Sequence, residues 1–468
     1  MIICYRYAIL AIAAMLVACT TNTVDDNSIT PTTDGDNTND STPAGVIEWM
    51  DEMLSEYYLY NSEYNSMERD MDRDYDEFLE DHLLSMSTNV FDKKWYDYYN
   101  EYSIYSYIDR ESTGGVSMSR SLNATELGYG VVNFVIFTDY SSKPFGFGVL
   151  GVYPDSPAER AGVVRGDIIT KVGSSSINSY NYYSLILSLL YPSSGATVEL
   201  TMYDNSVKSI TAETIEPNPI LKSGYLDQDE EIGYIAYAQF NSSFDDELRD
   251  AVRGVSGAKE LILDLRINGG GYNSSAVIFG SAIRGSSSAT EVFSEYVYNS
   301  TITNRYTKYD YFKSSEGILS LPVKRIYCLV SSSTASASEL LINALEGIGY
   351  DVILIGDTTK GKNVGMFIFY KTSDGYTYEL APICFASKNA AGFYEYQDGF
   401  SPDYYVNEYN NFTDYGVGES LVDAAIYHIE NGSFPVVSVA RSGSTLELHA
   451  GEVFGRNRPH TMIMEIDE

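Results

Sequence analysis

Short apolar runs alternate with amphipathic segments along the chain between about residues 220 and 432. An uninterrupted apolar run bounded by turn residues is typical of a strand buried on both faces, whereas apolar positions every three or four residues are typical of a helix. The expected strands are residues 232–240, 260–265, 326–331 and 352–355, and the expected helices are residues 244–255, 272–283 and 336–346. This alternation predicts βαβ units, a mostly parallel sheet and a mixed α/β fold, with a core domain at residues 216–435.

A pattern of short strands and tight turns precedes this core, and we assign it to a separate domain at residues 124–215. Residues 145–153 alternate glycine with apolar side chains. Pro157 suits the first turn of a short helix, and Gly162 suits its end. The remaining expected elements are a strand at residues 168–172, a helix at residues 180–190 and a strand at residues 198–203.

The chain before these two domains changes character twice. Apolar residues recur at helical spacing from residue 45 to residue 113, which predicts a small acidic helical domain at residues 45–123. The segment before it, residues 19–44, consists almost entirely of small and polar residues, so we interpret it as an unfolded tether. Residues 436–468 form a C-terminal extension.

The first 18 residues have the pattern of an export signal. Arg6 precedes an apolar run, residues 9–17, that is too short to remain as a spanning helix. Leu16-Val17-Ala18-Cys19 resembles a bacterial lipobox, which predicts cleavage before Cys19 and its lipidation. Thr20 is not the aspartate that signals inner-membrane retention, so we expect an outer-membrane lipoprotein on the periplasmic face or the cell surface. The alternative is an ordinary signal peptide with a chance cysteine.

Net charge bears on the binding partners of the chain, and the cysteine positions bear on disulfide bonding. Asp and Glu number 65 against 30 Lys and Arg, and the formal net charge is −35. Such a chain is repelled by nucleic acid, which we exclude as a partner. Cys328 and Cys384 lie in apolar, strand-like runs and are interpreted as buried small side chains, although spacing alone leaves a disulfide between them open.

Histidine is informative by its absence. The chain has four histidines, and none lies between residues 83 and 427, where the α/β core is expected. A Ser-His-Asp triad would therefore need a distant histidine to fold back. Clusters with metal-ligand spacing are also missing from the sequence, and we expect no cofactor.

Ser336 and Lys362 are the candidate nucleophile and base. Ser336 stands at the start of an expected helix, within the run Thr334 to Glu339. Lys362 follows the expected strand 352–355 and a short turn, where burial could bring the pKa of an amine to roughly 7–8. Each residue has a simpler interpretation: Ser336 could only cap the helix, with Glu339 completing a capping box, and Lys362 could be a solvated charge.

A tetrahedral oxyanion needs two fixed hydrogen-bond donors. The backbone N–H of Ala337, next to Ser336, is one candidate. The turn after the expected strand 260–265 runs Asn268-Gly269-Gly270-Gly271, and its glycines allow a close backbone approach. Such a turn could also cradle phosphate, but it lacks the Lys-Ser/Thr pair of a P-loop.

These segments together resemble the C-terminal processing peptidases, also called tail-specific proteases. The resemblance implies that Ser336 is the nucleophile, that Lys362 is the base, and that Gly270 or Gly271 joins Ala337 in the oxyanion hole. The family carries a PDZ domain, and the run SPAERAGVVRGDIITKVG in the domain at residues 124–215 resembles one. The implied fold is a βαβ-rich peptidase core with a crotonase-like sheet, a PDZ domain and the N-terminal helical domain.

The PDZ resemblance implies a peptide-binding site, with Gly128, Tyr129 and Gly130 as the loop that holds a terminal carboxylate. One departure from the peptidase family concerns Met366, which stands where relatives often have a glutamine that orients the lysine. Asn363, Thr358 or Thr359 could replace that glutamine.

We therefore expect a lipid-anchored serine endopeptidase that captures protein or peptide segments. The main alternative is a non-catalytic peptide-binding lipoprotein on a protease fold, and a second is acyl-group chemistry on a small molecule. The physiological substrate and the oligomeric state stay open.

Overall fold

The computed structural model describes residues 42–96, 101–112, 124–286, 290–436, 449–455 and 461–464. The chain divides into two units, Met1–Ser41 and Thr42–Glu468, and only the second contains described residues. The expected signal, Cys19 and the expected tether up to residue 41 therefore lie outside the described residues. Within the described part of the chain, no helix is both long and apolar enough to cross a bilayer.

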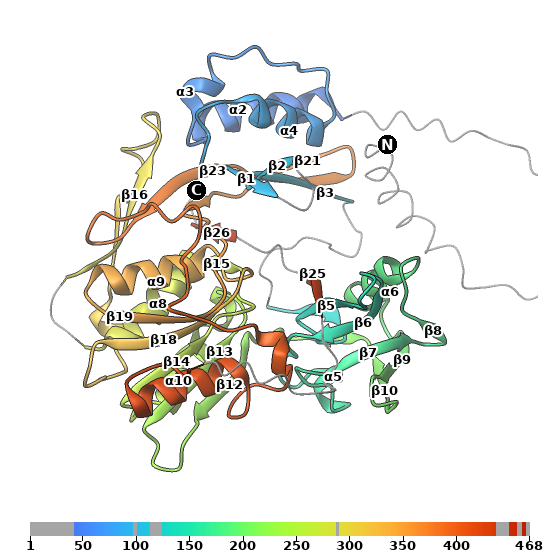
Figure 1. The fold of residues 1–468 in the computed structure, drawn as a ribbon. Coiled ribbons are helices and arrows are strands. Elements are labelled where there is room, and N and C mark those ends of the chain that lie inside the picture. Colours follow the sequence, from blue (N-terminus) through green and yellow to red (C-terminus); the bar gives the residue numbers. More distant parts are fainter. Residues whose placement is uncertain are drawn as a thin grey trace, which may run out of the picture. The chain divides into compact units, whose positions relative to one another are not determined.

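The core domain expected at residues 216–435 is built on a six-stranded sheet in which all neighbours but the first pair are parallel (Figure 1). In spatial order its strands are β12 (Ile220–Tyr225), β13 (Ile232–Tyr237), β14 (Glu260–Asp264), β18 (Arg325–Val330), β19 (Asp351–Gly356) and β24 (Tyr404–Tyr405). This confirms the mixed α/β class. The strands are apolar on both faces because helices cover both faces.

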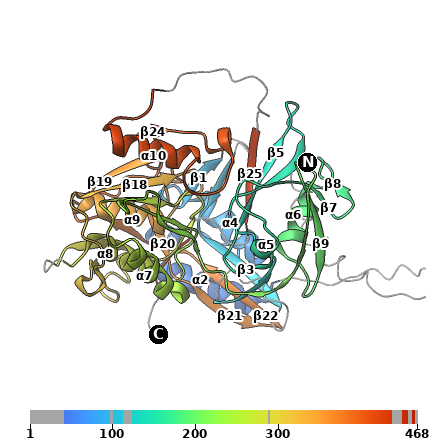
Figure 2. The same ribbon diagram turned by 90° about the horizontal axis from the view of Figure 1, so that it is seen from below.

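Four helices pack on this sheet, and Figure 2 shows them on opposite sides of β18 and β19. Three of them share the largest apolar cluster, and the fourth belongs to a cluster with Tyr234, Ile262 and Leu329 on the other face. The three are α7 (Asp245–Gly254), α8 (Asn273–Arg284) and α9 (Ala337–Gly347), and the fourth is α10 (Ser420–Asn431).

A second six-stranded sheet lies beside the start of α9 and contains segments that are far apart in the sequence. Its order is β15 (Gly270–Tyr272), β26 (Thr461–Ile463), β20 (Val364–Met366), β23 (Ile383–Lys388), β16 (Val292–Tyr298) and β17 (Tyr309–Tyr311). The sequence pattern did not predict this sheet, because most of its strands are short and their pairing is long-range.

The expected second domain is a sheet with two helices. Its strand order is β10 (Val207–Thr211), β9 (Thr197–Met202), β7 (Ile168–Val172), β6 (Pro144–Val149), β5 (Asn133–Thr138) and β25 (His449–Gly455), with β8 (Ser175–Ser176) beside β7. Helices α5 (Pro157–Arg160) and α6 (Tyr182–Leu190) pack with it, while β4 (Glu126–Gly128) pairs with β11 (Glu213–Ile215). Gly162, with φ of 75°, follows α5 as expected.

The N-terminal region differs from the all-helical expectation. Three helices are present, but strands follow them, and one of these strands pairs with a strand of the core domain. The helices are α2 (Ala44–Tyr57), α3 (Asn61–Tyr64) and α4 (Tyr75–Ser85), and the strands are β1 (Lys93–Tyr96), β2 (Glu101–Ile104) and β3 (Tyr107–Ser112). Strand β3 joins β22 (Tyr376–Ala381) and β21 (Phe369–Ser373) in a three-stranded sheet.

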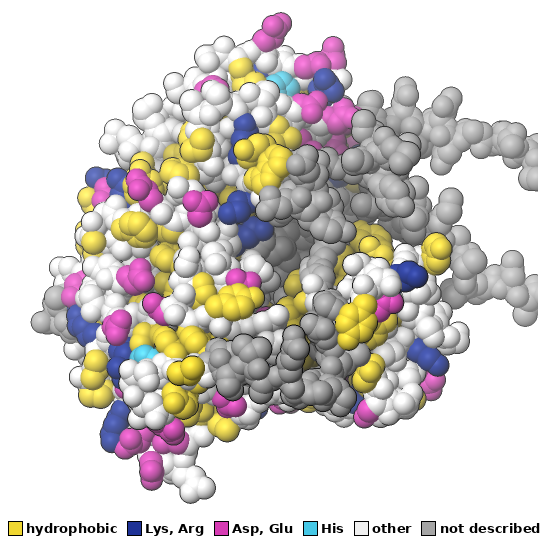
Figure 3. Space-filling view, in the orientation of Figure 1, with side chains coloured by type: hydrophobic (Ala, Val, Ile, Leu, Met, Phe, Trp, Pro, Cys, Tyr) yellow, Lys and Arg dark blue, Asp and Glu magenta, His cyan; other side chains and the backbone are white. Residues whose placement is uncertain are grey.

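This region also shares an apolar cluster with the core domain. Its helices bury Leu54, Phe78 and Leu83 in one cluster with Met366 and Leu380. The cause of the difference is therefore tertiary: the segment after α4 is rich in tyrosine, which favours strands, and it finds a strand edge to pair with. Acidic side chains gather over the N-terminal helices, at the top of Figure 3.

Cys328 and Cys384 are both buried and both free. Each lies in a strand, β18 and β23 respectively, as their apolar surroundings predicted. Burial raises the pKa of both thiols well above the ordinary range.

Candidate active site

Ser336 occupies a sharp turn between strand β18 and helix α9. Its φ of 63° and ψ of −112° lie outside the regions that non-glycine residues prefer, which costs on the order of 1–3 kcal/mol. The side chain is fully buried, and its Oγ has no hydrogen-bond partner among the described residues. Ser336 is the N-cap of α9 and forms a capping box with Glu339, yet its Oγ makes no hydrogen bond of ordinary geometry, unlike a cap that is held by its side-chain oxygen.

Glu339 fixes this turn against the turn that carries Lys362. Its Oε2 accepts hydrogen bonds from the backbone N–H groups of Ser336, at 2.9 Å, and Lys362, at 2.8 Å. Its Oε1 accepts from the hydroxyl of Thr359 and the N–H of Gly361, both at 2.6 Å. The carboxyl group is completely buried, so burial raises its pKa while these four hydrogen bonds oppose the rise.

The structure therefore brings Ser336 and Lys362 together, because one carboxylate oxygen binds both backbones. From the sequence, Glu339 was expected only to complete a capping box with Ser336. The capping role holds for the Ser336 N–H, but the second oxygen binds a turn about 20 residues further along the chain, which the local pattern could not reveal.

The glycine turn is tied to the same helix start through Asn268. The carbonyl oxygen of Asn268 accepts from the N–H of Ala335, at 3.2 Å, and from the hydroxyl of Ser338, at 3.0 Å. Gly270 and Gly271 follow with φ of 109° and 139°. A Cβ on Gly271 would stand 2.0 Å from the carbonyl oxygen of Phe240, so only glycine fits there.

Backbone N–H groups near Ser336 are the candidates for an oxyanion hole. Ala337 is the first residue of α9, and the N–H at that position has no acceptor inside the helix. The N–H of Gly270 donates to Oδ1 of Asn268 at 2.9 Å, so it is already engaged. The choice between Gly270 and Gly271 as second donor stays a prediction.

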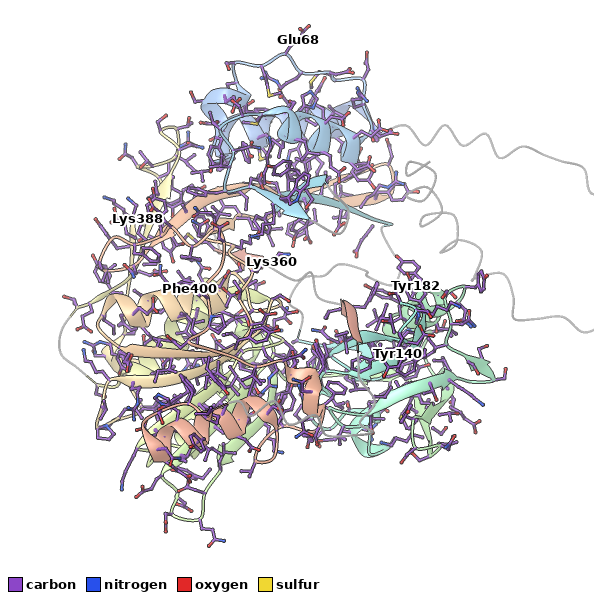
Figure 4. The ribbon with its side chains drawn as sticks, in the orientation of Figure 1. Glu68, Tyr140, Tyr182, Lys360, Lys388 and Phe400 are labelled. Carbon is purple, nitrogen blue, oxygen red and sulfur yellow. The ribbon has the colours of Figure 1, made fainter. Side chains whose placement is uncertain are left out.

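Lys362 is almost fully buried, with 1% of its surface exposed, whereas Lys360, labelled in Figure 4, is half-buried. The Nζ of Lys362 lies 5.0 Å from the ring centre of Tyr105. Burial is what the proposed base requires, and it excludes the simple interpretation of a solvated surface charge.

The sequence missed the N-terminal residues that surround Lys362. Asp92 is fully buried and accepts hydrogen bonds from Tyr58, at 2.7 Å, and from both the N–H and the hydroxyl of Ser106, at 2.8 Å. Burial raises the pKa of Asp92, while these hydrogen bonds and the positive charge of Lys362 act to lower it. The local sequence carries no motif that points to Asp92.

The residues that could orient Lys362 in place of the family glutamine differ in their hydrogen bonds. Met366 is fully buried in the cluster of the N-terminal helices. The hydroxyl of Thr359 binds Glu339, whereas the buried Oδ1 of Asn363 lacks a partner among the described residues. Asn363, next to the lysine, is thus an acceptor that remains available.

A buried chain of charges links the glycine turn to the second domain. Arg266, two residues before Asn268, binds Asp264 at 2.7 Å and Glu419 at 2.7 Å. Glu408 lies 3.6 Å from Arg266 and 2.6 Å from Arg165, which belongs to the second domain. Burial alone would lower the pKa of Arg266, but the carboxylates outweigh it and the net shift is upward.

The predicted carboxylate-binding loop packs tightly. Gly130 has φ of 91°, and a Cβ there would stand 2.1 Å from Cβ of Ser156. The carbonyl oxygen of Tyr129 accepts from the N–H of Ala158 at 2.9 Å, and Gly128 ends strand β4. The role of this loop in binding stays a prediction.

The described residues contain no group of three or more side chains suited to hold a metal ion.

Two segments of the chain match known protein families. Residues 231–406 match Peptidase family S41, and residues 148–188 match a PDZ domain. The carboxyl-terminal-processing peptidase 2 of Arabidopsis thaliana chloroplasts is 28% identical over 250 residues, which cover 51% of this chain and 46% of that protein. The carboxy-terminal processing protease CtpA of Bacillus subtilis is 29% identical over 215 residues, covering 44% of this chain and 42% of that protein.

The chain spans about half the length of the curated relatives it matches. A crystal structure of a putative S41 protease from Bacteroides fragilis has the same fold, with a TM-score of 0.63 and 21% identity over 82% of this chain and 97% of that chain. With an S41 match behind a PDZ match, and relatives that are carboxyl-terminal processing enzymes, this chain is similar to the C-terminal processing peptidases.

Proposed function

We propose that this protein is a serine endopeptidase with a Ser336–Lys362 dyad and that its PDZ domain captures peptide or C-terminal segments of its substrates. The observation that carries the proposal is the shared carboxylate of Glu339, which binds the backbones of both dyad residues. The unused hydroxyl of Ser336 and the burial of Lys362 support the same roles.

In this mechanism Lys362 accepts the proton of Ser336 as Oγ attacks the scissile carbonyl. The negative charge develops near the N–H of Ala337 at the positive end of α9, and near the Gly270–Gly271 turn. The ammonium of Lys362 returns the proton to the departing amine. Water then attacks the acyl-enzyme, and Lys362 repeats its role as base.

The anchor and the location are part of the same proposal. Lipidation at Cys19 would hold the enzyme at the outer membrane, with residues 20–44 as a tether. The support is the lipobox-like run that ends at Cys19. Because a bacterial lipoprotein cysteine carries more than one acyl chain, such an anchor would be stable.

The proposed function is tested by hydrolysis of unfolded casein by the wild type, Ser336→Ala and Ser332→Ala. Ser332 is an exposed serine near the same turn and serves as the matched control. We expect Ser336→Ala to lose hydrolysis by about 1,000-fold or more while Ser332→Ala keeps it. Equal hydrolysis by all three proteins would refute the dyad, and no hydrolysis by the wild type would favour the non-catalytic peptide-binding alternative, which the buried Met366 keeps open.

A further inference from the structure

Residues 449–455 and 461–464, which together we call the tail segment, contribute a strand to two different sheets. Strand β25 is the last strand of the PDZ sheet, beside β5, and β26 stands between β15 and β20 in the second six-stranded sheet. One short piece of chain thus lies in the candidate peptide-binding domain and at the candidate catalytic site.

In the PDZ domain the tail segment takes the place of an added peptide strand. Strand β25 is antiparallel to β5, with His449 opposite Thr138 and Gly455 opposite Asn133. It therefore runs toward the start of β5, the end nearer in sequence to Gly128–Gly130. Strand addition to a sheet edge is how PDZ domains bind peptides.

Side chains on both sides of this strand fit the same interpretation. The ring of Phe454 lies 6.0 Å from that of Tyr183 on α6, in an edge-to-face arrangement, and packs against the PDZ apolar cluster. Tyr182, labelled in Figure 4, belongs to the same helix. Ala450, in contrast, is exposed.

At the catalytic site the tail segment stands between the two strands that carry the candidate groups. Strand β26 pairs parallel to β15, with Thr461 opposite Gly270 and Met462 opposite Gly271. It also pairs parallel to β20, which begins two residues after Lys362, and the N–H of Met464 donates to the carbonyl oxygen of Met366 at 3.3 Å. The tail segment thus runs along the predicted oxyanion turn.

We propose that the tail segment is an internal ligand of the peptide path, and that a peptide substrate must displace it from both positions. The strand positions rest on the observed pairing, whereas the competition with substrate rests on the proposed function. Without the tail segment, β5 and the facing edges of β15 and β20 have unpaired backbone groups, which an extended peptide satisfies equally well.

A tethered ligand has an advantage over a free one. Because it belongs to the same chain, it binds intramolecularly, so a free peptide of the same sequence competes poorly. The apparent affinity for a free peptide falls in proportion to the fraction of molecules with an open path. Weakening the contacts of the tail segment must therefore strengthen binding of a free peptide.

The test measures binding of a fluorescent synthetic peptide, residues 447–464, by anisotropy. All proteins carry Ser336→Ala, so that binding needs no catalysis. We compare the full chain, the full chain with Phe454→Ala, and the full chain with Ala450→Ser as the matched control. We expect Phe454→Ala to bind the peptide about tenfold more tightly than the full chain, because an anchoring aromatic is lost from the tethered competitor. Ala450→Ser should bind as the full chain does.

A deletion of residues 437–468 provides a second arm. The deleted protein, if it keeps a cooperative thermal transition, should bind the peptide most tightly, and with an intact Ser336 it should hydrolyse casein faster than the full chain. Equal binding by the full chain, Phe454→Ala and the deleted protein would overturn the inference, as would no binding to a folded deleted protein. If the deletion does not fold, Phe454→Ala decides alone. The two proposals can fail separately. If the proteins bind the peptide in the predicted order but none hydrolyses casein, the proposed function is refuted, whereas the inference of an internal ligand is supported.

Discussion

The unusual backbone of Ser336 has an identifiable support. A positive φ at a serine persists only where the surroundings fix it, and here the Ser336 N–H is held by Glu339 while Ala335 and Ser338 are held by Asn268. The Oγ of Ser336 makes no hydrogen bond of ordinary geometry among the described residues. The residues that position the helix start thus do not engage this hydroxyl, which is what the proposed nucleophile requires.

Replacing Lys362 by arginine should lower kcat for peptide hydrolysis by about 100-fold or more. A guanidinium stays charged and cannot accept a proton from Ser336. Lys360→Arg, at the half-buried lysine of the same turn, is the matched control and should keep most activity. Hydrolysis rates of both variants on a reporter peptide make the comparison, and an active Lys362→Arg enzyme would exclude the lysine as base.

Replacing Glu339 by glutamine should disturb the site through its backbone contacts. An amide nitrogen cannot accept the hydrogen bonds that Oε1 or Oε2 now accepts, so at least one buried N–H loses its partner, at about 1–3 kcal/mol. We expect a lower melting temperature together with a fall in kcat that exceeds any change in KM. Unchanged melting and unchanged kcat would show that Glu339 does not position the dyad.

Some features of the site can be recognised from short sequence motifs, whereas others depend on contacts between distant parts of the chain. Ser336, Ala337 and the glycines stand in short motifs, so the sequence identified them as candidates. The φ of Ser336, the reach of Glu339 to Gly361, and the burial of Asp92 beside Lys362 depend on contacts across long sequence separations. Such contacts leave no periodic pattern, which is why the sequence did not reveal them.

At the scale of elements, the strongly patterned segments were predicted to within a few residues. Strand β7 has the expected bounds, and α9 was expected one residue early, at Ser336. The second six-stranded sheet and strands β1 to β3 were not predicted. Short strands that pair with distant segments carry weak local signals, and their formation is decided by the edge they meet.

Glu346, near the end of α9, gives this helix a pH-dependent stability. Burial, and then the charge of Asp403, raise the pKa of Glu346 from 4.5 to about 7. The folded state therefore favours the protonated form, and its contribution is complete below pH 4.5 and is lost as the pH rises through about 7.

Glu346→Gln, which mimics the protonated form, should therefore match the wild type near pH 4 and be more stable at pH 8, by roughly 2–3 kcal/mol. Urea unfolding at both pH values measures the difference. A stability difference that is the same at both pH values would show that Glu346 does not titrate with a raised pKa.

At the scale of the whole molecule, the described regions depend on one another. The N-terminal helices share an apolar cluster with β20, and the Arg165–Glu408–Arg266 chain joins the PDZ domain to the peptidase core. The sequence separated these regions at changes of composition. It could not show that their contacts surround Lys362 and the glycine turn.

The proposed membrane attachment belongs to this scale as well. Cys19→Ser should move the protein from the membrane fraction to the soluble fraction, because the acyl chains would have no site of attachment. Fractionation after a high-salt wash, followed by immunoblotting, makes the measurement. A Cys19→Ser protein that still sediments with membranes would exclude lipidation at this cysteine as the anchor.

The most direct test of the account is to identify the residue that reacts with a fluorophosphonate probe. Peptide mass spectrometry after labelling would be carried out on the wild type, Ser336→Ala and Ser332→Ala. The account predicts a single phosphonylated residue, Ser336, with labelling lost in Ser336→Ala and kept in Ser332→Ala. Labelling of a different residue, or equal labelling of the wild type and Ser336→Ala, would contradict it.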